Sequence, residues 1–282
     1  MTQSRSECVL HEGLGYSSAA PWLKLDLFLP SATVEAVPCV MVIAGGGFLA
    51  QDGQRFRHFA VSLAVNGFAA ALIAYRGRPH HTCRETISDA KAAVRFVRSI
   101  SGEYGIDPDR IAAVGRSAGG ALAVLLAVTG GMGEFEGDGG HPAASSRVQA
   151  AAAIAGVYDF VARFETQEQV SAQPEVDRKL KSNAEWIGAP FSTTDESWLR
   201  ASAINHITST VPPILLIHSK GDPLVPWMQS RDMHAALREA GAEAEIELSE
   251  SGGHVGRANS NELVLAFLRK ALAEPSPATY PE

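Results

Sequence analysis

Hydrophobic and polar positions follow two rhythms along this chain, one typical of buried strands and one of helices. Short runs that are mostly apolar at consecutive positions are typical of strands buried on both faces of a parallel sheet. They predict strands at residues 39–44, 69–74, 110–114, 150–154, 214–218 and 244–248. Residues 24–29 instead alternate between apolar and polar, which predicts an antiparallel strand at the sheet edge.

Helical patterns fill the gaps between these strands. We expect helices at residues 55–65, 85–100, 121–128, 226–240 and 260–273. Regular alternation of strand and helix favours a doubly wound, mostly parallel sheet with right-handed crossovers and helices on both faces. The predicted fold class is therefore α/β, in a single domain spanning residues 1–282.

Two segments interrupt the alternation. Residues 130–146 are rich in Gly, Ala and Asp and are typical of a surface loop. Residues 158–210 hold helical fragments but no clear strand, so they predict a helical, cap-like insertion before the penultimate strand. We expect this insertion to lie over the edge of the sheet where such folds bind ligands. Its aromatic residues have two interpretations, core packing or pocket lining, and these residues are Trp186, Phe191 and Trp198.

Composition narrows the classes of partner. The net charge is −7 without a long basic run, which argues against nucleic acid, because phosphate binding needs a clustered basic surface. No window is apolar for long enough to span a membrane, and residues 1–16 lack the apolar core of a secretory signal. We therefore expect a cytoplasmic location. Three scattered cysteines suggest neither a disulfide framework nor a zinc site. The sequence leaves a homo-oligomer open.

The most informative motif is Gly-Arg-Ser-Ala-Gly-Gly at residues 115–120. It is a G-x-S-x-G motif between a predicted strand and a predicted helix. A serine on such a sharp turn is exposed, and it becomes a nucleophile when a base and hydrogen-bond donors lie beside it. Ser117 is therefore the candidate nucleophile.

A base and an acid follow in the chain, each on a loop after a strand. Asp222 lies between a buried strand and a helix, and His254 lies between the last strand and the last helix. The order Ser, Asp, His is that of α/β-hydrolases. Asp159 is a weaker alternative for the acid, because it opens the insertion. His80 and His81 are alternative site residues on a loop, and we interpret His218 as a core residue or one that supports the site.

The glycine run at residues 45–47 predicts the remaining part of an acyl-transfer site, an oxyanion hole. One donor is expected to be the Ala118 amide, which follows the nucleophile at a helix N-terminus. The other is expected from Gly46 and Gly47, where a side chain would block the substrate carbonyl. A phosphate-binding interpretation of this run fails, because the spacings of nucleotide-binding loops are absent.

Together, Ala44–Phe48, residues 74–76, residues 104–111 and residues 115–120 resemble α/β-hydrolase esterases. The likeness spans residues 22–272 and is strongest to the branch with acetyl xylan esterases, bacterial feruloyl esterase-like domains and hormone-sensitive-lipase-like carboxylesterases. It implies an α/β-hydrolase fold, with Ser117 as nucleophile, Asp222 as acid and His254 as base. It places Gly46, Gly47 and Ala118 in the oxyanion hole. The family usually has His before the three glycines, and this chain has Ala44.

These observations predict a serine hydrolase that cleaves small-molecule acyl esters through an acyl-enzyme, without a cofactor or a metal. An amidase, formamidase or acylaminoacyl-peptidase-like activity on the same three residues is the first alternative. A non-catalytic binding protein with a hydrolase fold is the second, and the complete set of site residues argues against it.

Overall fold

A single mixed sheet organises the part of the chain that the computed structural model describes, which is residues 8–31, 35–168, 174–254 and 259–273. The strands lie in the order β1-β2-β4-β3-β5-β6-β7-β8. Their bounds are β1 Cys8–Gly15, β2 Lys24–Pro30, β3 Val37–Ile43, β4 Ala69–Ile73, β5 Ile106–Arg116, β6 Ala150–Ile154, β7 Ile214–Ser219 and β8 Ala244–Ser249. The pairs β1–β2 and β2–β4 are antiparallel, and the other neighbours are parallel. The predicted α/β architecture with a mostly parallel sheet is confirmed.

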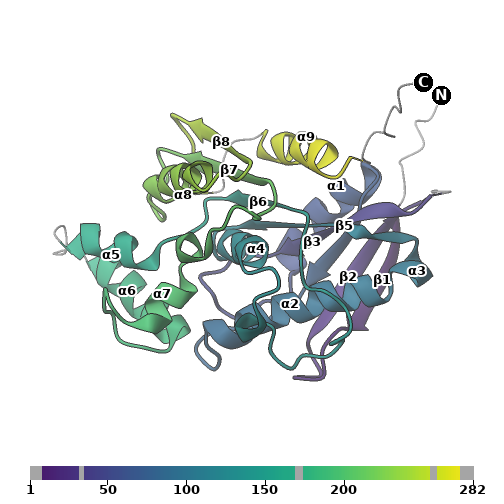
Figure 1. Ribbon diagram of the computed structural model, residues 1–282, viewed down its shortest axis with the longest axis horizontal. Coiled ribbons are helices and arrows are strands. Elements are labelled where there is room, and N and C mark those ends of the chain that lie inside the picture. Colours follow the sequence, from purple (N-terminus) through teal and green to yellow (C-terminus); the bar gives the residue numbers. More distant parts are fainter. Residues whose placement is uncertain (1–7, 32–34, 169–173, 255–258, 274–282) are drawn as a thin grey trace.

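Helices pack on both faces of this sheet, as Figure 1 shows. The α-helices are α1 Arg57–Val65, α2 Cys83–Ser99, α3 Ser101–Tyr104, α4 Ala118–Val128, α5 Phe160–Glu168, α6 Pro174–Ile187, α7 Glu196–Ala201, α8 Met228–Glu239 and α9 Ser260–Ala271. Short 3-10 turns lie at Gln54–Phe56, Gly133–Phe135 and Ala203–His206. Helices α1 and α9 cover one face, whereas α2, α4 and α8 cover the other.

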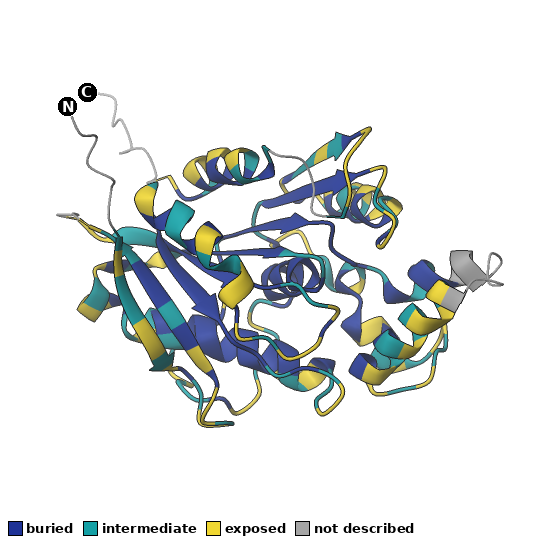
Figure 2. Cartoon of the chain, turned by 180° about the vertical axis from the view of Figure 1, so that it is seen from behind, coloured by how far each residue is buried: buried dark blue, intermediate teal, exposed yellow. Residues whose placement is uncertain are grey.

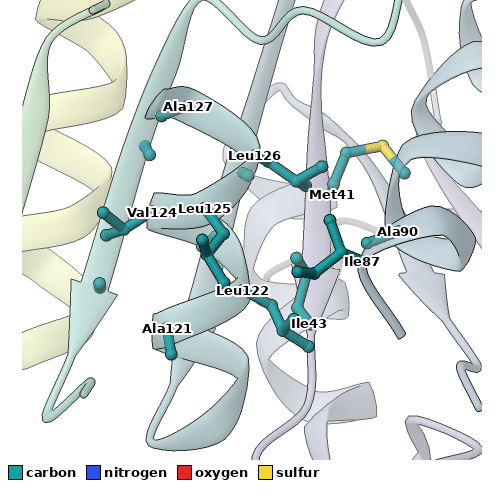
Figure 3. Close-up of a cluster of buried hydrophobic side chains, with 14 of the residues drawn as sticks. Met41, Ile43, Ile87, Ala90, Ala121, Leu122, Val124, Leu125, Leu126 and Ala127 are labelled. Atoms are coloured by element: carbon teal, nitrogen blue, oxygen red, sulfur yellow. The ribbon is translucent and has the colours of Figure 1, made fainter. Parts of the chain in front are cut away.

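The two faces arise from the alternation of side chains along each strand. In β3, Met41 and Ile43 point toward α2 and α4, while Val40 and Val42 point toward α1. Figure 3 shows the first of these layers, with Leu122 and Leu126 of α4 beside Met41, Ile43 and Ile87. Every residue of α4 is buried, so this helix is apolar on all sides. It fixes the end of β5, where the candidate nucleophile lies.

The sequence prediction is wrong at one edge of the sheet. β2 is antiparallel as expected, but it is an interior strand, because β1 pairs along its outer side. The periodicity of β1 is broken by a register shift between His11 and Leu14, and its residues are only partly buried. Figure 2 shows the contrast between the buried central strands and the exposed outer helix surfaces. An edge strand with one solvated face has only a weak hydrophobic pattern, which explains why the search for apolar runs did not predict β1.

Helices α5, α6 and α7 lie between β6 and β7, as predicted for the insertion before the penultimate strand. The aromatic residues there form core contacts. Trp186 is fully buried and stacks on Phe48 at a ring-centroid distance of 3.8 Å. Phe191 meets Trp198 edge to face at 4.9 Å, and Trp198 is fully buried. The bounds of the insertion at 158–210 and the single-domain assignment stay predictions.

Candidate active site

Ser117 occupies the turn between β5 and α4, in a backbone conformation that few residues other than glycine adopt. Its φ is 54° and its ψ is −122°. Such a conformation costs about 1–3 kcal/mol and persists only where the surroundings enforce it. Here the Ser117 amide donates to the carbonyl of Ile154 at 2.8 Å. A side chain at Gly119 would collide with the carbonyl oxygen of Ile43, so only glycine lets α4 approach β3. The tight packing of strand and helix thus presents the Ser117 hydroxyl.

The structure brings the three residues singled out as nucleophile, base and acid into one chain of hydrogen bonds. His254 Nε2 lies 2.8 Å from Ser117 Oγ, and His254 Nδ1 lies 2.8 Å from Asp222 Oδ2. The three residues are separated by up to 137 positions in sequence. They meet because β5, β7 and β8 are parallel, which places the loops after their carboxyl ends on one edge of the sheet.

Asp222 is held as a carboxylate. Its side chain is fully buried, and burial by itself raises the pKa of a carboxyl group. Hydrogen bonds from His218 and His254 and from the backbone amides of Leu224 and Val225 outweigh burial and hold the pKa of Asp222 well below its usual value. The two amides lie 2.8 and 3.0 Å from Oδ1. Each carboxylate oxygen therefore has two partners, and the acid is both charged and fixed in orientation.

His218 supports this acid from the buried side. Its Nε2 lies 3.2 Å from Asp222 Oδ2 and 3.1 Å from the carbonyl oxygen of Val225. A carbonyl only accepts hydrogen bonds, so we assign the proton to Nε2. Nδ1 then accepts from the Ser230 hydroxyl at 2.7 Å. The sequence suggested a supporting role for His218, but the contact with Asp222 came only from the structure.

The predicted oxyanion residues lie beside Ser117. Gly46, Gly47 and Ala118 line the same pocket as Ser117 and His254. Ala118 is the first residue of α4, so its amide is among the unpaired N–H groups at a helix N-terminus. A side chain at Gly45 would collide with the carbonyl oxygen of Arg116, because the glycine loop lies directly against the turn.

Two side chains brace the glycine loop and were not singled out from the sequence. The Tyr75 hydroxyl donates to the Ala44 carbonyl at 2.6 Å, and both residues are buried. Arg78 Nε donates to the Gly47 carbonyl at 2.8 Å, and Arg78 also pairs with Glu185 of α6 at 2.8 Å. The loop is thus anchored at both ends, although this chain has Ala44 where the resemblance implies a histidine. In the sequence, the adjacent Tyr and Arg at residues 75–76 are the feature that could have indicated a role for Tyr75.

The pocket in front of Ser117 has a volume of about 420 Å³. Part of its lining comes from the glycine loop, the turn at Ser117 and residues 55–56. Another part comes from α5 and α6 of the insertion and from the loop that carries Asp222, and its members are Arg163, Lys179, Ser182, Asn183, Leu224 and Val225. The sequence predicted that the insertion lies over the site, but it did not identify these polar residues. Trp186, Phe191 and Trp198 are not among the lining residues.

The alternative site residues lie elsewhere. The Asp159 carboxylate accepts from the Ala162 amide at 2.8 Å in the first turn of α5, and no hydrogen bond joins it to His254 in the described chain. His80 and His81 are absent from the described lining of the pocket. Within the described ranges, no group of three or more His, Cys, Asp or Glu side chains is arranged to hold a metal ion. In the same ranges, no helix has the length and apolarity needed to cross a membrane.

Known proteins that are similar to this chain include esterases. A family model described as BD-FAE matches residues 25–237. The chain is 32% identical to a probable carboxylic ester hydrolase, LipM, of Mycobacterium tuberculosis, over 91% of this chain and 60% of that protein. It is 26% identical to isoprenylcysteine alpha-carbonyl methylesterase ICME of Arabidopsis thaliana, over 83% of this chain and 54% of that protein. The chain thus spans about half to three fifths of the length of these curated relatives.

Solved structures share the fold over nearly the whole chain. A truncated carbohydrate esterase from gut microbiota superposes with a TM-score of 0.84 at 24% identity, covering 97% of this chain and 99% of the other. A bifunctional GH43-CE protein of Bacteroides eggerthii gives a TM-score of 0.83 at 27% identity, covering 96% of this chain and 39% of the other. The overall arrangement of sheet and helices is therefore that of known esterase domains.

Proposed function

The chain belongs to the BD-FAE family of α/β-hydrolase-fold esterases, and from this premise we propose that it is a serine carboxylic ester hydrolase acting on small acyl esters. The observation that carries the proposal is the unbroken chain of hydrogen bonds from Ser117 through His254 to Asp222, with 2.8 Å at each step. These distances lie within the reach that proton transfer between a nucleophile and its base requires.

In the first half of the reaction, Ser117 Oγ attacks the acyl carbon while its proton passes to His254 Nε2. The former carbonyl oxygen becomes negative and is stabilised by the backbone amides of Ala118 and the glycine loop. His254 then gives the proton to the departing alkoxide as the ester C–O bond breaks. An alcohol leaves, and the acyl group remains on Ser117.

In the second half, a water molecule attacks the acyl carbon and His254 takes its proton. Collapse of the tetrahedral intermediate returns that proton to Ser117 Oγ and releases a carboxylic acid. Asp222 accepts the Nδ1–H of His254 throughout, which fixes the ring orientation and stabilises the imidazolium. The lowered pKa of Asp222 supports this role, because the acid stays ionised when His254 is protonated.

The test is Ser117→Ala measured on p-nitrophenyl acetate. We expect essentially complete loss of turnover with an unchanged melting temperature, since the substitution removes one oxygen that is only partly buried. Full activity in this variant would refute the proposed nucleophile. Labelling with a fluorophosphonate probe provides an independent check, because a non-catalytic binding protein would not react at Ser117. Comparison of one acyl group as an ester and as an amide separates the esterase from the amidase alternative.

A further inference from the structure

We propose that the active-site pocket contains a carboxylate-binding subsite formed by Arg163, Lys179 and Asn183, so that the preferred ester carries a carboxylate on one of its two halves. The inference rests on the proposed esterase function and deepens it by naming a substrate class.

The first observation is the charge of the pocket lining. Four basic residues line it, and no Asp or Glu does so among the lining residues that the structure describes; the basic residues are Arg55, Arg116, Arg163 and Lys179. The chain as a whole has 31 acidic and 24 basic residues and a net charge of −7. A pocket of this sign in an acidic protein concentrates anions and repels cations.

The second observation is the environment of Arg163. This residue is only 7% exposed, yet no ion pair with a described residue neutralises it. Its Nη2 donates to the Leu224 carbonyl at 3.2 Å, whereas its Nε has no partner in the described chain. Burial lowers the pKa of Arg163 to about 10, so the guanidinium still carries its charge at neutral pH. A buried guanidinium without a counter-ion is costly and is strongly stabilised by an incoming anion.

Asp222 does not serve as that counter-ion by hydrogen bonding. Its charge acts on Arg163 through space, but both of its oxygens already have two partners each. Those hydrogen bonds hold His254 and the loop that carries Asp222. The Arg163 guanidinium therefore lines the pocket without a carboxylate bonded to it in the described chain.

The third observation is that Lys179 and Asn183 add further donors at helical spacing on α6. They are four residues apart, so their side chains lie on one face of the helix. Asn183 is 4% exposed, and its Nδ2 has no hydrogen-bond partner in the described chain. The pKa of Lys179 is lowered by burial and by the nearby charge of Arg163, against the opposing effects of Glu175 and Asp222. An anion beside the two cations relieves their repulsion.

A carboxylate matches this set of groups better than a neutral oxygen does. Guanidinium and ammonium groups are donors only, and the planar guanidinium is suited to two parallel hydrogen bonds with a carboxylate. A hydrogen bond to a charged group contributes about 1.5–3 kcal/mol, which corresponds to roughly tenfold to hundredfold in kcat/KM. The pocket volume of about 420 Å³ suits a small ester of this kind.

The experiment compares matched pairs of esters by titration of the acid released. In one arm the acyl half differs, with monomethyl succinate against methyl butyrate. In the other arm the alcohol half differs, with 3-acetoxypropanoate against propyl acetate. We expect the charged member of at least one pair to have the higher kcat/KM in the native protein. Arg163→Met should lower the ratio of kcat/KM for the charged ester to kcat/KM for its neutral partner about tenfold to hundredfold, while the neutral ester is still hydrolysed.

Lys179→Gln tests the charge on α6 that faces the pocket, and Lys181→Gln on the same helix is its matched control. Lys181 lies on the same helix, but its side chain is 75% exposed, pairs with Asp177 and does not line the pocket. We expect Lys179→Gln to lower the ratio and Lys181→Gln to leave it unchanged. This pair keeps the test valid if Arg163→Met fails to fold. Equal kcat/KM for the charged and neutral members of both pairs in the native protein would overturn the subsite.

Calorimetry separates this proposal from the esterase function itself. Monomethyl succinate and 3-acetoxypropanoate are titrated into Ser117→Ala and into Ser117→Ala/Lys179→Gln. Binding that weakens in the double variant supports the subsite even if no ester is hydrolysed. Hydrolysis of the neutral esters without any such binding difference retains the esterase function and refutes the subsite.

Discussion

The hydroxyl of Tyr75 provides the sharpest test of how the glycine loop is held, and Tyr75→Phe removes that single atom. Burial raises the pKa of Tyr75 well above its usual value, so the hydroxyl is protonated and donates to the Ala44 carbonyl at 2.6 Å. Ala44 directly precedes the glycine loop. The substitution leaves this carbonyl buried without its side-chain donor, and it loosens the start of the loop that carries Gly46 and Gly47.

The expected magnitude has two parts. A buried acceptor left without its partner costs about 1–3 kcal/mol of folding free energy, which corresponds to a lower melting temperature by roughly 2–4 °C per kcal/mol. Outright removal of one oxyanion donor lowers kcat by about 10²–10³-fold. Tyr75 acts on such a donor only through the backbone, so we expect kcat to fall about tenfold. KM should change little, because the loss is felt in the transition state.

Tyr16→Phe is a matched control. The Tyr16 hydroxyl donates to the Ala74 carbonyl, also at 2.6 Å, and Tyr16 is equally buried, but Ala74 follows β4 rather than preceding the glycine loop. Both variants should lose similar stability in thermal melts, and only Tyr75→Phe should lose kcat on p-nitrophenyl acetate. An equal kcat in the two variants at equal loss of stability would refute a positioning role for Tyr75.

The remaining predictions concern the acid and the turn at the nucleophile. Because the folded pKa of Asp222 lies below the unfolded value of about 3.9, its stabilisation is fully present above that pH and is lost as the pH falls below it. The melting-temperature gap between the native protein and Asp222→Asn should therefore be wide near pH 7 and shrink near pH 3, and a gap that widens on acidification would contradict this sign. Gly119→Ala should destabilise the protein severely, because the added carbon collides with the Ile43 carbonyl, whereas Gly102→Ala meets open space. Chemical denaturation compares the two, and equal unfolding midpoints would disprove the packing argument.

Much of the fold could be predicted from the chain because buried strands and amphipathic helices repeat with different periods. The central strands are apolar at nearly every position, so β3, β4 and β6 were found close to their observed bounds. β1 was missed because it lies at the sheet edge, where partial exposure and a register shift erase the pattern. Tertiary pairing alone turned β2 from a predicted edge strand into an interior strand.

The sequence by itself determined the chemical types and the order of the candidate site residues. A serine on a strand–turn–helix motif, followed by Asp and His after later strands, suffices to predict that the three meet, since parallel strands end at one edge of the sheet. The tertiary structure decided which other groups join them. His218 reaches Asp222, Tyr75 reaches Ala44, and Arg163 enters the pocket through contacts that no local periodicity encodes. Local patterns specify how each segment folds, whereas burial, charge and hydrogen bonding at a site depend on segments far apart in sequence.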